Sequence, residues 1–177
     1  MVEDKGGEPM SHVAVLTADL FEDVELWYPY YRLQEAGHRV DLVGCEAKTT
    51  HQGKRGTTAT TTAAAADLDV SSLDGIVIPG GFSPDYMRRC HDLVSLVKEM
   101  GRASKPTAAI CHGPWMLASA GLLDGKDATS FYSIKDDIVN AGARWHDREM
   151  VRDDNIITSR SPDDLAAFMR EVLAALG

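Results

Sequence analysis

Cys111 is the residue of this chain whose surroundings most favour chemistry. It follows the apolar run from Thr107 to Ile110 and precedes His112, Gly113 and Pro114, after which good helix formers resume. This pattern predicts a buried strand that turns sharply into a helix. A thiol in front of a helix faces unpaired backbone N–H groups and the positive end of the helix dipole, both of which favour the thiolate. We therefore predict a nucleophilic cysteine at this turn.

A second sharp turn lies earlier in the chain. Gly75 to Ile78 is a continuous apolar run that ends in Pro79, Gly80 and Gly81, a pattern typical of a central parallel strand followed by a tight turn. In open parallel sheets, functional sites form at the carboxyl ends of the strands. Both this turn and Cys111 occupy that position, so we expect them to lie close together.

Strands and amphipathic helices alternate along the rest of the sequence. This alternation predicts right-handed crossovers and a mostly parallel sheet covered by helices on both faces. In the last helix, Ser161 is expected to be the N-cap and Pro162 the first helical residue. The sequence predicts strands at 12–16, 39–43, 75–78, 107–110, 148–152 and 156–158, helices at 24–36, 92–103, 114–120, 133–140 and 162–176, and a short hairpin within 49–62.

Length and composition limit the class of protein. The 177 residues suit a single domain over 12–177, preceded by a flexible tail over 1–11. A net charge of −9 argues against nucleic acid or an anionic membrane as partner, because both require clustered Lys and Arg. The chain shows neither a signal peptide nor an apolar run long enough to span a membrane, so we expect a cytoplasmic protein.

The three cysteines are Cys45, Cys90 and Cys111, an odd number without CxxC spacing. This pattern predicts neither a disulfide framework nor a zinc site. Cys45 is expected in the core and Cys90 in a surface loop. Since no metal-binding or phosphate-binding motif is present either, we expect no metal and no cofactor.

Several motifs follow one another in unbroken order: AxxFEDVEL at 18–26, PGG at 79–81, AICHGP at 109–114, YSIKDD at 132–137 and NAG at 140–142. They resemble those of the ThiJ/PfpI superfamily, and most closely its PfpI-type intracellular proteases and glycation-repair proteins (peptidase C56-like). The resemblance extends over residues 13–176, and the motifs together are far more specific than any one of them. It implies a flavodoxin-like α/β fold, a three-layer α/β/α sandwich with a cysteine nucleophile elbow.

The resemblance also implies roles for individual residues. Cys111 would be the nucleophile and His112 the base, and the N–H groups of Gly81 and His112 would form the oxyanion hole. Glu22 matches the glutamate that approaches the sulfur and could donate a proton to it. Asp85 matches an acid that orients the histidine from a neighbouring subunit, where glutamate is usual, and its shorter side chain reduces the reach by about 1.5 Å.

Each of these residues also has a purely structural interpretation. Cys111 could be an apolar filler of the core, and His112 a turn residue that points to solvent. Glu22 could be an acid stabilised by the dipole of the following helix, and Asp85, after Pro84, could equally be a helix cap.

We consider three functions. The leading hypothesis is a stress-response cysteine hydrolase that acts on reactive dicarbonyls or glycated proteins, as a glyoxalase or deglycase. The second is an intracellular cysteine peptidase that uses Cys111, His112 and Asp85. The third is a redox sensor or chaperone in which Cys111 is oxidised and no substrate is turned over. A glutamine amidotransferase is disfavoured because its histidine lies far from the cysteine in sequence. The resemblance further implies a homodimer or hexamer.

Overall fold

A central parallel sheet organises the computed structural model, which describes residues 10–177 of the chain. The predicted tail over 1–11 therefore lies almost entirely outside the described residues. The strands of this sheet are β1 (His12–Leu16), β2 (Arg39–Gly44), β5 (Ala63–Ala64), β6 (Gly75–Ile78), β7 (Thr107–Ile110), β10 (Met150–Asp153) and β11 (Ile156–Ser159).

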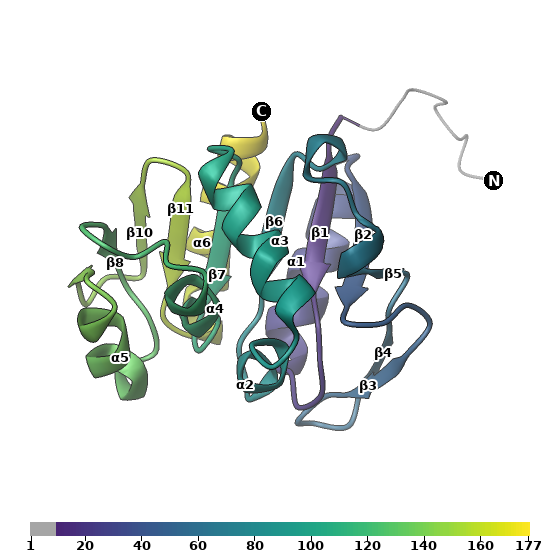
Figure 1. The fold of residues 1–177 in the computed structure, drawn as a ribbon, viewed down its shortest axis with the longest axis horizontal. Helices are drawn as coiled ribbons and strands as arrows, with labels where there is room; N and C mark the ends of the chain where they lie inside the picture. Colours follow the sequence, from purple (N-terminus) through teal and green to yellow (C-terminus); the bar gives the residue numbers. More distant parts are fainter. Residues whose placement is uncertain (1–9) are drawn as a thin grey trace.

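The strand order is β10-β11-β7-β6-β1-β2-β5, and every neighbouring pair is parallel except β10 with β11 (Figure 1). The inner order β2-β1-β6-β7-β11 is the flavodoxin-like arrangement of a doubly wound sheet. The carboxyl ends of β1, β6 and β7 meet at one edge of the sheet, the lower edge in Figure 1. The expected fold class is therefore confirmed.

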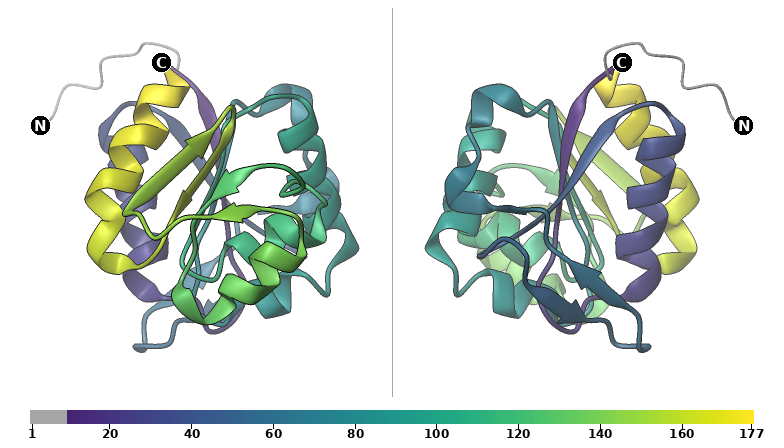
Figure 2. Two further views of the ribbon diagram at one scale, coloured as in Figure 1. Left: turned by 90° about the vertical axis from the view of Figure 1, so that its left-hand side faces the viewer. Right: turned by 90° about the vertical axis from the view of Figure 1, so that its right-hand side faces the viewer.

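Helices cover both faces of the sheet, which gives three layers (Figure 2). One face packs against α1 and α6, and the other against α3 and α4. Side chains alternate along β1 because successive residues of a strand point to opposite faces. Val13 and Val15 face α1 and α6, while Ala14 and Leu16 face the opposite layer. The helices are α1 (Asp23–Glu35), α2 (Ser83–Met87), α3 (His91–Arg102), α4 (Pro114–Ser119), α5 (Lys135–Asn140) and α6 (Leu165–Leu176).

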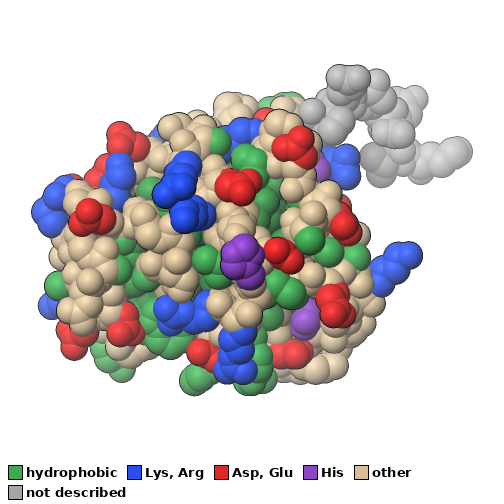
Figure 3. All heavy atoms as spheres, viewed as in Figure 1, with side chains coloured by type: hydrophobic (Ala, Val, Ile, Leu, Met, Phe, Trp, Pro, Cys, Tyr) green, Lys and Arg blue, Asp and Glu red, His purple; other side chains and the backbone are tan. Residues whose placement is uncertain are grey.

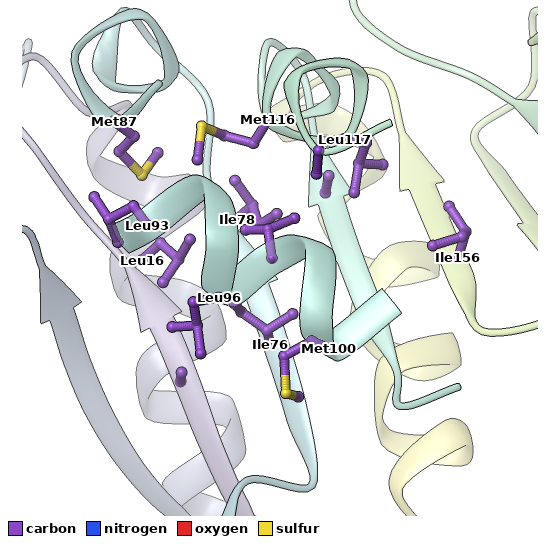
Figure 4. Packing of buried hydrophobic residues seen from close by; sticks show 14 of the residues in the cluster. Leu16, Ile76, Ile78, Met87, Leu93, Leu96, Met100, Met116, Leu117 and Ile156 are labelled. Atoms are coloured by element: carbon purple, nitrogen blue, oxygen red, sulfur yellow. The ribbon is translucent and has the colours of Figure 1, made fainter. Parts of the chain in front are cut away.

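The core beneath α3 is built from aliphatic and methionine side chains. Figure 4 shows Leu93, Leu96 and Met100 of α3 next to Ile76 and Ile78 of β6. The spacing of Leu93, Leu96 and Met100 places them on one face of the helix, and all three are buried. Burying such side chains contributes about 1.5–3 kcal/mol each, so this contact fixes α3 on the sheet.

The shortest elements differ most from the predictions. The bounds of β1, β6 and β7 agree with the sequence, and the predicted hairpin exists as β3 (Thr50–Gln52) paired with β4 (Thr58–Thr60). Four short strands and helices within residues 10–177 were missed: α2, β5, β8 (Asp127–Ala128) and β9 (Arg144–Trp145). Elements of two to five residues are too short to show a period. The last helix begins as a 3-10 turn at Pro162–Asp164, and the Ser161 side chain does not cap it.

A disulfide joins Cys45 and Cys90, so the prediction that no disulfide forms was wrong. Cys45 is also exposed, not buried in the core, and Cys90 directly precedes α3. The two Cα atoms lie 6.0 Å apart although 45 residues separate them in sequence. The parallel topology brings the end of β2 and the start of α3 together at the carboxyl edge of the sheet. Among the described residues, Cys111 is the free cysteine.

The surface of the described chain is mixed in character. Figure 3 shows acidic, basic and hydrophobic side chains interspersed over the face that carries α3. Within residues 10–177, no helix combines the length and the apolar character needed to cross a membrane.

Candidate active site

Cys111 lies on a strained turn at the end of β7. Its φ of 62° is in the left-handed region, which is costly for a residue with a side chain. Backbone hydrogen bonds hold it there: Cys111 N donates to Ser159 O at 3.0 Å, and Phe131 N donates to Cys111 O at 2.9 Å. Gly113 follows, where a Cβ atom would lie 2.4 Å from Ile78 O. The turn therefore needs a glycine two residues after the cysteine, and the sequence has Gly113 there.

The Gly80–Gly81 turn at the end of β6 lies directly against Cys111. A Cβ on Gly80 would be 2.7 Å from Cys111 Cβ and 2.8 Å from His112 N. Gly81 has a φ of 73°, in the same left-handed region. Burial raises the pKa of the Cys111 thiol, and the backbone N–H groups of Gly81 and His112, which point at the sulfur, oppose that rise. The two predicted oxyanion donors therefore lie together at the nucleophile.

The carboxyl group beside the sulfur belongs to Glu25. Glu25 is fully buried in the first turn of α1, and its Oε2 accepts a hydrogen bond of 2.8 Å from Gly80 N. Its Oε1 is buried and accepts no hydrogen bond from the described protein groups, so it can still accept one. Burial raises the pKa of Glu25 to about 7, although its contacts with Gly80 and Cys111 act in the opposite direction. This carboxyl group can therefore hold a proton at neutral pH.

Glu25 and Cys111 are coupled through their charges. Burial raises the pKa of the thiol, and the negative charge of an ionised Glu25 raises it further. Two neighbouring buried anions repel each other, so the pair carries one negative charge before it carries two. With one negative charge, the proton lies either on Glu25, which leaves a thiolate that receives a hydrogen bond, or on the sulfur, which leaves a Glu25 carboxylate. Burial of the thiol and the charge of Glu25 favour the second arrangement in the resting site. Burial thus works against the thiolate expected from the turn alone. Transfer of the thiol proton to the Glu25 carboxylate is the step that would form a thiolate here.

Glu22 does not have the role that we predicted for it. It immediately precedes α1, and its two carboxylate oxygens bind Lys54 Nζ at 3.0 Å and Arg55 Nε at 2.9 Å. Burial acts to raise the pKa of Glu22, but these two cations outweigh it and hold the pKa below its usual value. Glu22 is therefore an ion-paired carboxylate, and a poor proton donor to the sulfur.

The sequence contains a signal that distinguishes the two glutamates. Glu25, Pro29 and Leu33 are spaced by four residues and are all buried, so they mark the face of α1 that packs on the sheet. Glu22 lies before the helix begins. A glutamate on the buried face of a helix needs a polar reason to be there, and this argument identifies Glu25.

His112 lies between the nucleophile and a ring of aromatic side chains. Its Nδ1 is 3.2 Å from Cys111 Sγ, and its Nε2 is 3.3 Å from Ser133 Oγ. The ring stacks on Phe131 and meets Trp115 edge-on, with both centroids 5.2 Å away. Burial and the positive charge of Lys54 lower the pKa of His112. A neutral imidazole at pH 7 can act as a general base.

Asp85 does not orient His112 within one chain. It lies on α2, where its carboxylate pairs with Arg89, and among the described residues it makes no hydrogen bond to His112. The histidine instead contacts Ser133, which the YSIKDD motif contains but to which sequence reasoning gave no role. The contribution of Asp85 from a neighbouring subunit stays a prediction. Within residues 10–177, no three His, Cys, Asp or Glu side chains are placed to hold a metal ion together.

The site combines a strained cysteine, an adjacent histidine and a buried glutamate at the carboxyl edge of a flavodoxin-like sheet. These features together point to one protein family. The model of the DJ-1/PfpI family matches residues 11–175. The chain belongs to the DJ-1/PfpI family. Deglycase PfpI of Pyrococcus furiosus is 43% identical over 164 residues, which cover 93% of this chain and 98% of that protein. Protein/nucleic acid deglycase 2 of Escherichia coli is 41% identical over 167 residues, with coverage of 93% and 97%.

A solved structure agrees with the fold of this DJ-1/PfpI chain. The two-domain protein of Anabaena variabilis, with DJ-1/ThiJ/PfpI-like and ferritin-like domains, superposes with a TM-score of 0.93 at 40% sequence identity. The match covers 94% of this chain and 48% of that one, in keeping with the second domain named for it. The family resemblance predicted from the motifs is therefore confirmed.

Proposed function

We propose that this protein is a cysteine-dependent hydrolase that acts on reactive dicarbonyls, or on the adducts that they leave on proteins. The observation that carries the proposal is the contact between Cys111 and the buried Glu25, whose pKa of about 7 allows it to act as an acid at neutral pH. The relatives named as deglycases support this class of substrate.

The arrangement suits addition of sulfur to a carbonyl group. The Cys111 thiolate adds to the aldehyde carbon of methylglyoxal, and the resulting oxyanion is bound by the N–H groups of Gly81 and His112. Glu25 then donates its proton to that oxygen. The neutral imidazole of His112 removes, as a proton, the hydrogen of the former aldehyde carbon.

The remaining steps conserve atoms and electrons. The electron pair of the broken C–H bond moves to the neighbouring carbonyl, which is reduced to an alcohol as the proton returns to its carbon. The first carbon, having lost the proton of its hydroxyl group, is thereby oxidised to a thioester with Cys111. Water cleaves the thioester, releases a hydroxy acid and restores the thiol. No external oxidant or reductant is needed.

We also propose that the site functions in a homo-oligomer, a dimer or a hexamer. Asp85 lies on α2 between Phe82 and Tyr86, whose side chains are exposed. Tyr28 and Tyr31 on α1 are exposed as well. Neighbouring exposed apolar side chains, such as each of these two pairs, are typical of interaction surfaces. A second subunit that covers α2 would bring further side chains to the mouth of the site.

Turnover assays on the wild-type protein test the proposed function. We expect conversion of methylglyoxal to lactate and of glyoxal to glycolate without an added thiol, measured by chromatography of the products. A fluorogenic peptide and a glycated peptide are assayed in parallel. Hydrolysis of the unmodified peptide with no hydroxy acid formed would favour a peptidase. Reversible oxidation of Cys111 with no turnover of any substrate would favour a redox sensor, and either result would overturn the proposal.

A further inference from the structure

We propose that Lys54 gives the Cys111 site a preference for substrates that carry a carboxylate next to the reactive dicarbonyl group. This inference rests on the proposed function for its substrates, but the charge that it invokes can be tested without turnover. It is carried by the position of Lys54, by the N–H donors that the described residues leave unpaired, and by the contrast with Arg55.

Hydrogen bonds and β-bridges hold Lys54 near the Gly80–Gly81 turn. It lies in the loop between β3 and β4, and its backbone N donates to Phe21 O at 2.9 Å. Phe21 forms bridges to both Gly53 and Gly81, so one residue ties the loop to the turn at the end of β6. Glu22, which binds Lys54 Nζ, also donates its backbone N–H to Gly80 O at 3.3 Å. The ammonium group is therefore anchored at the glycines that face Cys111.

The ammonium group of Lys54 retains capacity to bind a ligand. Lysine has three N–H donors, and among the described residues one hydrogen bond of Lys54 Nζ is made, to Glu22. Its side chain is 43% exposed, so the remaining donors are accessible to solvent. An anion could approach without breaking the contact with Glu22.

The charge of Lys54 reaches the catalytic groups. After burial, which is the larger cause, it lowers the pKa of His112, and it also acts to lower the pKa of the buried Glu25. Both pKa shifts are in the direction that a positive electrostatic potential at the site produces. A positive potential of this kind raises the local concentration of anions and speeds their encounter with the nucleophile.

Arg55 is the matched comparison for Lys54. It binds the same Glu22 carboxylate, at 2.9 Å, but its side chain is 73% exposed and it lies between Glu22 and Asp23. The charge of Arg55 is thus balanced by two acids. Lys54, and not Arg55, is among the main causes that shift the pKa of His112 and of Glu25. Replacing Arg55 by a neutral residue changes the net charge of the protein by the same amount as replacing Lys54. It therefore controls for the loss of one positive charge elsewhere on the protein.

Alkylation of Cys111 by iodoacetate and by iodoacetamide tests the inference directly. Both reagents form the same S–C bond and release iodide, but one is anionic and the other neutral. The ratio of their rates therefore reports the potential at the sulfur and cancels any change in the thiolate fraction. At low ionic strength we expect Lys54→Met to lower the iodoacetate to iodoacetamide ratio at least about threefold, and Arg55→Met to change it by less than about 1.5-fold.

Two further observations complete this experiment. Peptide mass spectrometry confirms that Cys111 is the residue alkylated, and 0.5 M NaCl should reduce the difference between wild type and Lys54→Met, because salt screens exposed charges. An unchanged ratio in Lys54→Met, or an equal fall in Arg55→Met, would overturn the inference.

Turnover provides the second arm. We expect Lys54→Met to lower kcat/KM for 2,3-dioxopropanoate, in which a carboxylate replaces the methyl group of methylglyoxal, at least about threefold more than for methylglyoxal itself. Equal losses for the two substrates would contradict the assigned preference. If the wild type turns over neither substrate, the proposed function fails, and the alkylation ratio still decides whether Lys54 sets the potential at Cys111.

Discussion

Replacement of Cys111 by serine should reduce the turnover of methylglyoxal and glyoxal by at least about a thousandfold, as expected when a nucleophile is removed. Serine differs from cysteine by one atom, and its hydroxyl group stays protonated beside the buried Glu25. The turn itself should survive, because it is held by the backbone bonds of residue 111 to Ser159 and Phe131. The measurement is product formation by the purified variant, with circular dichroism to show that it is folded.

The matched control is the double variant Cys45→Ser/Cys90→Ser, which removes the two disulfide-bonded cysteines and leaves Cys111 in place. We expect it to keep turnover within a few-fold of the wild type at temperatures where it is folded. Activity retained in Cys111→Ser would mean that the sulfur is not the nucleophile.

Loss of the Cys45–Cys90 disulfide should produce the largest change in stability. The bridge closes a loop of 45 residues, and the chain-entropy model for a loop of that length gives a stabilisation of about 4 kcal/mol. We therefore expect Cys90→Ser to lower the free energy of unfolding by about 2–4 kcal/mol under non-reducing conditions, as measured by urea denaturation.

Dithiothreitol provides the control for this prediction. It should lower the unfolding midpoint of the wild type to that of Cys90→Ser, and it should leave the variant unchanged. A wild-type midpoint that is the same with and without the reductant would show that the disulfide does not stabilise the fold.

The parts of the fold and site that depend on local patterns could be predicted from the sequence. β1, β6 and β7 are continuous apolar runs, and the two turns that follow β6 and β7 are marked by glycines. The rule that parallel strands end at a common edge then places Gly81 beside Cys111 and His112. The positions of these strands and turns can be predicted without knowing how side chains distant in sequence pack.

The parts that depend on distant side chains could not be predicted in the same way. Glu22 and Glu25 both lie in the FEDVEL motif, and which one reaches the sulfur depends on where α1 begins and how it rotates on the sheet. The pairing of Cys45 with Cys90 depends on the relative position of β2 and α3. Lys54 reaches the site because a short hairpin folds back on Phe21. A one-residue change in helix start or loop register would alter each of these contacts.

The pH dependence of Cys111 alkylation by iodoacetamide tests the central claim most directly. An ionised Glu25 raises the pKa of the thiol, so removing this charge in Glu25→Gln should shift the midpoint of the alkylation rate to lower pH, by at least about one unit. Glu22→Gln should shift it by less than about half a unit, because Glu22 is paired with Lys54 and Arg55. An unchanged midpoint in Glu25→Gln, or a larger shift in Glu22→Gln, would contradict the assignment of Glu25 as the partner of Cys111.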